Sequence, residues 1–206
     1  LGGYLADSYL GFRKAVTFGA ILLVLGHIGM AYEGNAAVQS IDGTITRDKG
    51  ALQIFYFSLS LIILGVGFLK ANISSIVGEL YRKGDTRRDS GFTIFYMGIN
   101  IGSWIATILC GYLGEAYGWG YGFGAAGIGM FFGLITFIWG KKYFLGKGEP
   151  KDLEKLKKKV IFGLNTEVII YILAVLSSLL IWQMVQRHSV VEILLMTAGA
   201  ASLIYI

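Results

Sequence analysis

A single lysine interrupts a long apolar stretch of the chain. Lys70 is the one charged residue in positions 61–77, a run rich in Leu, Ile, Val, Gly and Phe. An ammonium in the hydrocarbon core of a membrane costs at least about 2.5–3.5 kcal/mol, so such a residue usually faces a protein interior or a wet cavity. There it normally meets a substrate, a coupling ion or a partner carboxylate. Lys70 therefore indicates a site of the kind that membrane transport requires.

Two further polar residues stand at a spacing that could join this site. Tyr96 and Asn100 are four residues apart, so they share one face of a helix. Lys70 lies about 15 Å before position 80, where its apolar segment ends, and Asn100 lies about 14 Å after position 91, where the next one begins. Taken alone, either Tyr96 or Asn100 could simply form a hydrogen bond to a neighbouring helix. The depth shared with Lys70, near the membrane midplane where transporters hold their substrates, favours a common cavity.

The elements that must position these residues are helices that span a membrane. Hydrophobic residues make up 55% of the 206 positions and charged residues 15%, against roughly 25% charged in soluble domains. Apolar segments that meet or approach the ~20 residues of a membrane span lie at positions 15–31, 52–80, 91–113, 121–140, 160–186 and 190–206. We therefore predict an all-α integral membrane protein. Because the chain begins with Leu1 and not with Met, we expect an internal piece of a longer protein.

The loops between these segments carry an uneven charge. Positions 1–14, 81–90 and 141–159 hold two, four and eight Lys or Arg residues, 14 in all, while positions 34–50 and 114–120 together hold two. The positive-inside rule places the first group in the cytoplasm. The net charge of +5 follows mostly from this asymmetry. No basic run carries interleaved aromatics or an RNA-binding signature, so we expect no nucleic-acid partner.

Other kinds of chemistry find no support in the sequence. His27 and His188 stand far from each other and from Cys110, so no metal site is expected. The glycine pattern at positions 122–127 resembles a dinucleotide-binding motif, but it lies inside an apolar segment with no strand before it. Close helix packing explains this pattern better. With no Ser/His/Asp set either, we expect neither an enzyme nor a cofactor-binding protein.

One change in composition divides the chain. The only proline, Pro150, is followed by the densest basic run, at positions 151–159. Proline and runs of like charge mark boundaries between packed elements. We expect a four-helix block at 1–146, a basic linker at 147–159 near the lipid headgroups, and an added helical hairpin at 160–206 whose second helix is cut short.

Three motifs resemble those of a transporter family. Positions 2–13 read Gly-Gly-x-x-Ala-Asp-x-x-x-Gly-x-Arg. This is similar to the loop between the second and third helices of the major facilitator superfamily, in the form seen in proton-dependent oligopeptide transporters. The resemblance implies a cytoplasmic gating motif made of Gly3, Asp7, Gly11, Arg13 and Lys14. Asp7 would belong to a charge network that latches the two halves of the transporter, although Ser8 replaces the Arg often found after that Asp.

The other two motifs contain the candidate site. Positions 65–74, Gly-Val-Gly-Phe-Leu-Lys-Ala-Asn-Ile-Ser, resemble the family's fourth helix, in which the lysine binds in the central cavity. Ala71 stands where many members have proline. Positions 87–103 resemble the peptide-transporter signature at the start of helix five and include Tyr96 and Asn100. Trp104, directly after it, replaces a smaller apolar residue.

The resemblance implies a fold and a function. The chain would supply helices three to six of the amino-terminal six-helix half of a major facilitator superfamily protein, plus the additional helical pair of bacterial members. The whole protein would be a multi-pass protein of the cytoplasmic (inner) membrane that imports di- and tripeptides with protons, without a cofactor. Lys70 would take part in proton coupling and meet the peptide carboxylate or an acidic partner. Tyr96 and Asn100 would contact the peptide backbone or amino end.

The remaining helices of such a transporter are not in this chain, including a first helix with a proton-coupling Glu-x-x-Glu-Arg cluster. Besides peptides and protons, the expected partners are therefore those missing helices and the lipid bilayer. Two alternatives stay open. One is a symporter of the same superfamily for nitrate or amino acids, which the first helix would distinguish. The other is a membrane peptide receptor that does not transport, which uptake by the full-length protein would distinguish.

Overall fold

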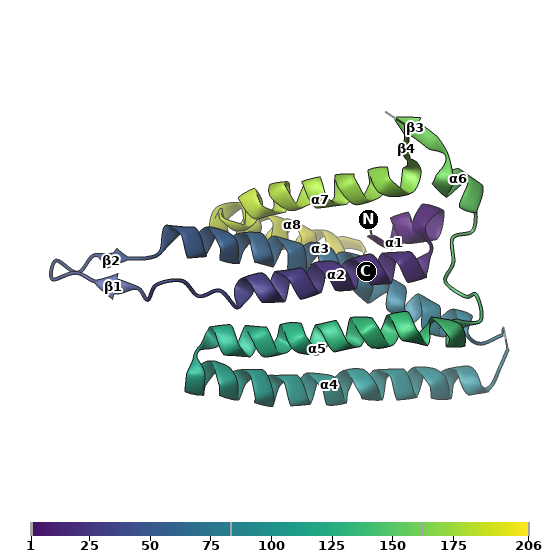
Figure 1. The fold of residues 1–206 in the computed structure, drawn as a ribbon, viewed down its shortest axis with the longest axis horizontal. Coiled ribbons are helices and arrows are strands. Elements are labelled where there is room, and N and C mark those ends of the chain that lie inside the picture. Colours follow the sequence, from purple (N-terminus) through teal and green to yellow (C-terminus); the bar gives the residue numbers. More distant parts are fainter. Residues whose placement is uncertain (1, 83, 162, 206) are drawn as a thin grey trace.

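Six long helices form the frame of the protein (Figure 1). The structure, a computed structural model, describes residues 2–82, 84–161 and 163–205. The long helices are α2 (Phe12–Met30), α3 (Lys49–Glu79), α4 (Arg87–Tyr117), α5 (Trp119–Trp139), α7 (Thr166–Val185) and α8 (His188–Tyr205). Within the described residues, all of these except α8 are long and apolar enough to cross a membrane. The predicted class of all-α membrane protein is confirmed.

Short elements connect the long helices. They are α1 (Gly2–Leu5), the π-helical turn η1 (Ala6–Leu10), β1 (Val38–Gln39), β2 (Ile45–Thr46), the 3-10 turn η2 (Gly140–Phe144), α6 (Leu153–Lys157), β3 (Lys159–Ile161) and β4 (Leu164–Asn165). β1 and β2 pair antiparallel, with Val38 opposite Thr46. β3 and β4 form a second antiparallel pair. Both pairs lie at helix connections, so neither adds a layer to the bundle.

The helix boundaries differ from the predicted ones by more than three residues in two helices, α4 and α7. α4 extends four residues beyond the apolar run at each end, because a helix can continue where its polar residues reach water. α7 begins at Thr166, and not near position 160. Gly163, at φ = +75°, lies between β3 and β4. The Asn165 side chain then accepts a hydrogen bond from the backbone N–H three residues on, at 2.9 Å, and so caps α7.

α2 lies at the centre of the bundle and packs between α3 and α5 (Figure 1). α4 packs on the other side of α5, and α7 packs on α3. α2 and α3 approach closely at Gly19 and Gly65, where a Cβ added to either glycine would lie 2.7 or 2.8 Å from the other's carbonyl oxygen. Small residues permit such close contact between membrane helices. α2 contributes more buried apolar side chains than any other described element, among them Val16 and Leu22.

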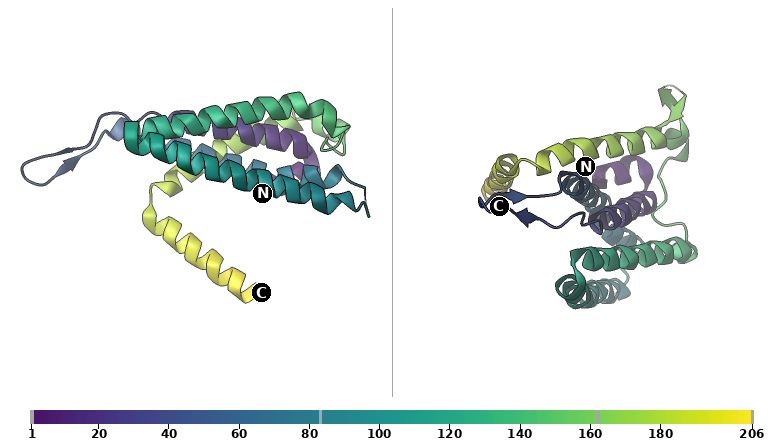
Figure 2. Two further views of the ribbon diagram at one scale, coloured as in Figure 1. Left: turned by 90° about the horizontal axis from the view of Figure 1, so that it is seen from below. Right: turned by 60° about the vertical axis from the view of Figure 1, so that its left-hand side comes forward.

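The connections lie at the two ends of the bundle. The β1–β2 hairpin and the α4–α5 turn lie at one end (Figures 1 and 2). α1, the described residues between α3 and α4, and residues 140–161 and 163–165 lie at the other, which we call the basic end. The loops before position 160 therefore sort into 14 Lys and Arg residues at the basic end and two at the opposite end, where Arg187, between α7 and α8, adds a third. That the basic end faces the cytoplasm stays a prediction from the positive-inside rule.

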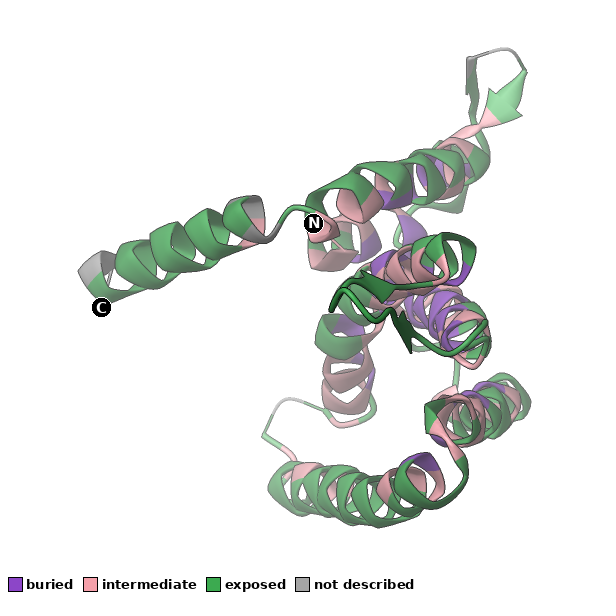
Figure 3. Ribbon diagram, turned by 90° about the vertical axis from the view of Figure 1, so that its left-hand side faces the viewer, coloured by how far each residue is buried: buried purple, intermediate pink, exposed green. Residues whose placement is uncertain are grey.

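α4 leaves most of its surface uncovered (Figure 3). Gly114 is its one buried residue, and large apolar side chains such as Ile94 and Trp104 are mostly exposed. α4 contacts the bundle mainly through α5. An apolar helix face of this kind suits lipid or further membrane helices. The α4 residues of the candidate site therefore lie on an open side of the bundle.

Candidate functional site

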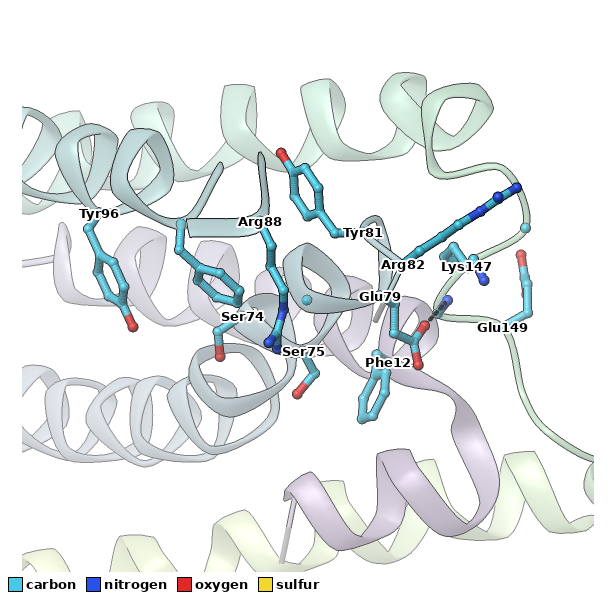
Figure 4. A pocket seen from close by; sticks show the side chains of 14 residues that line it. Phe12, Ser74, Ser75, Glu79, Tyr81, Arg82, Arg88, Tyr96, Lys147 and Glu149 are labelled. Atoms are coloured by element: carbon cyan, nitrogen blue, oxygen red, sulfur yellow. Dashed lines mark hydrogen bonds between the residues drawn. The ribbon is translucent and has the colours of Figure 1, made fainter. Parts of the chain in front are cut away.

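A cavity of about 940 Å³ opens between α3 and α4 near the basic end (Figure 4). Its wall consists of the last turns of α3, Tyr81 and Arg82 that follow them, the first turns of α4, Phe12 at the start of α2, and residues 146–149. α3 contributes the hydroxyls of Ser74 and Ser75, and α4 contributes the hydroxyl of Tyr96. A concave site with aromatic walls and a few polar groups is typical of small-molecule binding.

Arg88 extends from α4 across this cavity toward α3 (Figure 4). A Cβ added to Gly78 would lie 3.6 Å from Nη2 of Arg88, so the guanidinium rests against a residue without a side chain. The guanidinium carbon lies 5.5 Å from the centroid of the Phe92 ring, a cation–π contact. Among the described residues Arg88 has no ion-pair partner. The cavity thus contains a cation that could meet an anionic group.

The predicted site residues lie on the two helices that wall this cavity. Tyr96 lines it and stacks on Phe92, with 6.3 Å between ring centroids. Asn100 lies one turn further along α4 and donates its side-chain amide to the Tyr96 carbonyl oxygen at 2.9 Å. Lys70 lies one turn before Ser74 on α3, is exposed, and forms no ion pair within the described part of the chain. The structure therefore brings Tyr96 into the cavity and leaves Lys70 and Asn100 one helical turn beyond its lining.

The helix bounds give the distance of each predicted site residue from the basic end of its helix. Lys70 lies nine residues before the end of α3, about 14 Å along the helix. Tyr96 lies nine residues after the start of α4, also about 14 Å, and Asn100 lies 13 residues after it, about 20 Å. The first four residues of α4 precede its apolar run, and counted from that run Asn100 keeps the distance expected for it. The common depth of Lys70 and Asn100 in the membrane stays a prediction.

The gating motif lies at the basic end, between α1 and the first turn of α2. Gly3 belongs to α1 and Asp7 to η1. Gly11, at φ = +75°, joins η1 to α2. The Asp7 carboxylate accepts a hydrogen bond from Nζ of Lys151 at 2.6 Å, and both side chains are more than half exposed. Within this chain the partner of Asp7 is therefore a residue of the linker, and its role in a latch between two halves stays a prediction.

The two cations of the motif also have partners within the chain. Arg13 donates two hydrogen bonds to the Glu149 carboxylate, at 2.8 and 3.0 Å. Lys14 donates one to Glu167 at 2.6 Å. The Arg13 guanidinium holds the pKa of Glu149 below its ordinary value. The first turn of α2 is thus joined by charge to the linker and to the first turn of α7.

The sequence does not reveal these partners. Glu149, Lys151 and Glu167 lie 136, 144 and 153 positions from the residues that they contact. The motif resemblance directs attention to the other half of a transporter, and a count of loop charges does not show which acid meets which base. The one local signal is an acidic residue directly before Pro150, at the boundary between the helical block and the linker.

Comparisons with known proteins assign the chain to a family. The family model described as the POT family matches residues 13–201. The chain belongs to the POT family. It is 43% identical over 178 residues to the Bacillus subtilis protein named Uncharacterized transporter YclF. The matched region covers 86% of this chain and 33% of that protein. It is 38% identical over 185 residues to a protein of Lactococcus lactis named Di-/tripeptide transporter. This match covers 89% of this chain and 34% of that protein.

A solved structure supports the same assignment for this POT chain. A mutant of the peptide transporter POT in complex with alafosfalin is 39% identical, with a TM-score of 0.60 over 87% of this chain and 33% of that one. The chain spans about a third of the length of these relatives. The predicted fold class is confirmed as an all-α fragment of a major facilitator superfamily transporter, while the division into four helices of one half and an added helical pair stays a prediction. POT proteins are transporters, so this chain is part of a multi-pass membrane protein.

Proposed function

We propose that the full-length POT protein imports di- and tripeptides together with protons. Two similar proteins support this: one is named a di-/tripeptide transporter, and the other is a peptide transporter crystallised with alafosfalin. The observation that carries the proposal is the place of Lys70, one turn from Ser74 on the α3 face that walls the cavity. A cation at that place can meet the carboxylate that every free peptide carries.

Lys70 gives the proposal a mechanism. An ammonium at this depth is stabilised by a carboxylate, either from the protein or from the peptide. A proton that neutralises a protein Glu would release Lys70, and the peptide carboxylate would take the place of that Glu. Proton and peptide would then cross together, because the cation always needs one anionic partner.

The α4 residues would hold the rest of the peptide. The Tyr96 hydroxyl can both donate and accept a hydrogen bond, so it suits the peptide backbone. The Asn100 Nδ2 already donates to the Tyr96 carbonyl oxygen. Its Oδ1 remains an acceptor for the amino end of the peptide. Acceptors on α4 and a cation on α3 match the two ends of a zwitterionic peptide.

The remaining assignments belong to the same proposal. Gly3, Asp7, Gly11, Arg13 and Lys14 form the cytoplasmic gate of a protein in the bacterial inner membrane. Residues 1–146 belong to the amino-terminal transmembrane half, 147–159 to the linker, and 160–206 to the added pair. The elements α6 and β3–β4 at positions 153–165 are short enough for a connection of this kind. Protons are the coupling ion, and the transport step requires no cofactor.

Uptake by the full-length protein in proteoliposomes tests the proposal. A labelled dipeptide should accumulate when protons flow inward and not without the gradient. Lys70→Gln keeps a hydrogen-bonding group but removes the charge, so it should abolish gradient-driven uptake, and Lys70→Arg should impair it. Lys49→Gln, on the same helix and outside the cavity, is the control. Wild-type uptake by Lys70→Gln would refute the mechanism. Uptake of nitrate or amino acids, or peptide binding without uptake, would favour the alternatives.

A further inference from the structure

Residues 146–156 form a strap across the basic end of the bundle (Figure 1). The strap is tied to two helices through the backbone of Gly148. The Gly148 carbonyl oxygen accepts a hydrogen bond from the N–H of Arg13, in the first turn of α2, at 2.8 Å. The Gly148 N–H donates to Oε2 of Glu79, the last residue of α3, at 2.8 Å. The strap thus connects the start of α2 to the end of α3.

The strap also lies directly against the turn that contains Gly11. A Cβ added to Gly11 would lie 2.5 Å from the nitrogen of Pro150 and 2.6 Å from the carbonyl carbon of Glu149. Together with the positive φ, this contact requires glycine. Further along, Leu156 is buried in the same apolar cluster as Leu10. Backbone and apolar contacts therefore hold the strap in addition to its ion pairs.

The ion pairs between the gating motif and the neighbouring segments differ in exposure. They are Arg13–Glu149, Lys14–Glu167 and Asp7–Lys151. The Arg13 and Glu149 side chains are 21% and 33% exposed and share two hydrogen bonds, the geometry that makes such pairs strong. The Asp7 and Lys151 side chains are 57% and 69% exposed, and exposed pairs contribute little. The motif therefore has firmly held cations and a loosely held anion.

We propose that Glu149 and Glu167 are positioning residues of the gate. They keep the two cations of the motif fixed to the strap and to α7. Asp7 is then the charge that changes partner when the transporter switches. This assignment of fixed cations and an anion that changes partner rests on the transport function proposed above. It also gives the added helical pair a task, because its first helix moves with the amino-terminal half as one body.

Limited cleavage of the full-length protein by trypsin tests the anchor independently of transport. The segment after Glu149 contains five lysines before β4, at positions 151, 155, 157, 158 and 159. Cleavage of a segment that opens locally follows the population of the open form. Glu149→Gln should raise the cleavage rate about tenfold, because it removes the charge that makes the pair strong. Glu154→Gln, an exposed acid of α6 with no ion pair among the described residues, is the matched control and should stay within twofold.

Two further variants separate an anchor from a general loss of folding. Arg13→Glu combined with Glu149→Arg re-forms the pair with opposite polarity, so it should be cleaved more slowly than either single reversal and should recover uptake. Asp7→Asn should leave the cleavage rate within twofold while it lowers the uptake rate. Equal cleavage of Glu149→Gln and Glu154→Gln, or a double variant no better than the single reversals, would overturn the proposal. If the wild type shows no peptide uptake, both the proposed function and the gating role are rejected. The cleavage rates still show whether Glu149 holds the strap against α2.

Discussion

The Glu149 carboxylate accepts two hydrogen bonds from the Arg13 guanidinium, at 2.8 and 3.0 Å, although the two residues are 136 positions apart. A guanidinium and a carboxylate that share two bonds are held in both distance and direction. Arg13 lies in the first turn of α2, and Glu149 follows α5 and η2. The pair therefore joins the beginning of the four-helix block to the segment that leaves it.

This pair should stabilise the protein at neutral pH and lose that effect in acid. Arg13 holds the pKa of Glu149 below its ordinary value of 4.5, with smaller contributions from Lys141 and Lys14 and an opposing one from burial. A carboxyl group whose pKa is lowered by folding stabilises the folded state above its unfolded pKa, and this stabilisation is lost as the pH falls through the folded value. Glu149→Gln should lower the Tm at pH 7, and its difference from wild type should shrink below pH 4.5. A difference that does not change with pH would contradict this.

Gly11→Ala should destabilise the protein more than Gly43→Ala. Both glycines have positive φ, +75° and +82°, so alanine costs roughly 1–3 kcal/mol of backbone strain at each position. At Gly11 the new Cβ would also lie 2.5 Å from the nitrogen of Pro150, whereas a Cβ at Gly43 would meet nothing within 4 Å. Thermal unfolding of the two purified full-length variants measures the difference. Equal losses of thermal stability would show that the strap does not restrict the space at Gly11.

Cysteines at positions 3 and 71 should form a disulfide. A Cβ added to Gly3 would lie 3.9 Å from the Cβ of Ala71, within the range that disulfides require. In a Cys110→Ala background, mild oxidation should protect both cysteines from alkylation, which mass spectrometry detects. The control pair combines Ala71→Cys with Gly98→Cys, since a Cβ at Gly98 would have no neighbour within 4 Å. Free thiols in the first pair would mean that α1 does not lie against α3.

Much of this fold could be predicted because membrane helices follow local composition. The apolar run at positions 52–80 predicts α3, Lys49–Glu79, to within three residues. Hydropathy does not register the polar turns of a helix, so α4 is longer at both ends than its apolar run. Hydropathy also misses the late start of α7, which the stretch Gly163-Leu164-Asn165 does indicate in the sequence. The exact ends of α4 require the structure.

The candidate site likewise contains residues that the sequence predicts and residues that it does not. Lys70 could be found from the sequence because a charge in an apolar run costs free energy that composition alone reveals. Tyr96 and Asn100 could be found from their spacing and from the motif resemblance. Glu149 and Glu167 could not, because their importance depends on which cation lies nearby after folding and on how far water is excluded from the pair. Neither property follows from local composition.

Single cysteines at positions 43 and 155 should react from opposite sides of the membrane. Gly43 follows β1 in the hairpin at one end of the bundle, and Lys155 lies in α6 at the basic end. By the positive-inside rule, the 14-to-two distribution of Lys and Arg predicts that the basic end faces the cytoplasm. In whole cells carrying the full-length protein with its native cysteines, Cys110 among them, replaced by alanine, an impermeant maleimide should label position 43 and spare position 155. Labelling of both from outside would reject this topology.

Tyr96→Phe should weaken peptide binding, while Tyr112→Phe, on the same helix, should not. Tyr96 lines the cavity and stacks on Phe92, so phenylalanine keeps the ring contact and removes only the hydroxyl. Tyr112 lies outside the cavity and packs its ring against Tyr117, with 6.2 Å between centroids. It therefore controls for the loss of a hydroxyl from an exposed tyrosine of α4.

The expected change in the Kd for the peptide follows from the hydrogen bond that Tyr96→Phe removes. Within the described part of the chain the Tyr96 hydroxyl makes no hydrogen bond, while the backbone carbonyl of the same residue accepts one from Asn100. The substitution should therefore affect the substrate and not the fold. A hydrogen bond contributes about 0.5–1.5 kcal/mol, which raises the Kd about two- to twelvefold. Titration of the full-length variants with a dipeptide measures this, and a Tyr96→Phe protein with the wild-type Kd would exclude that hydroxyl from the peptide site.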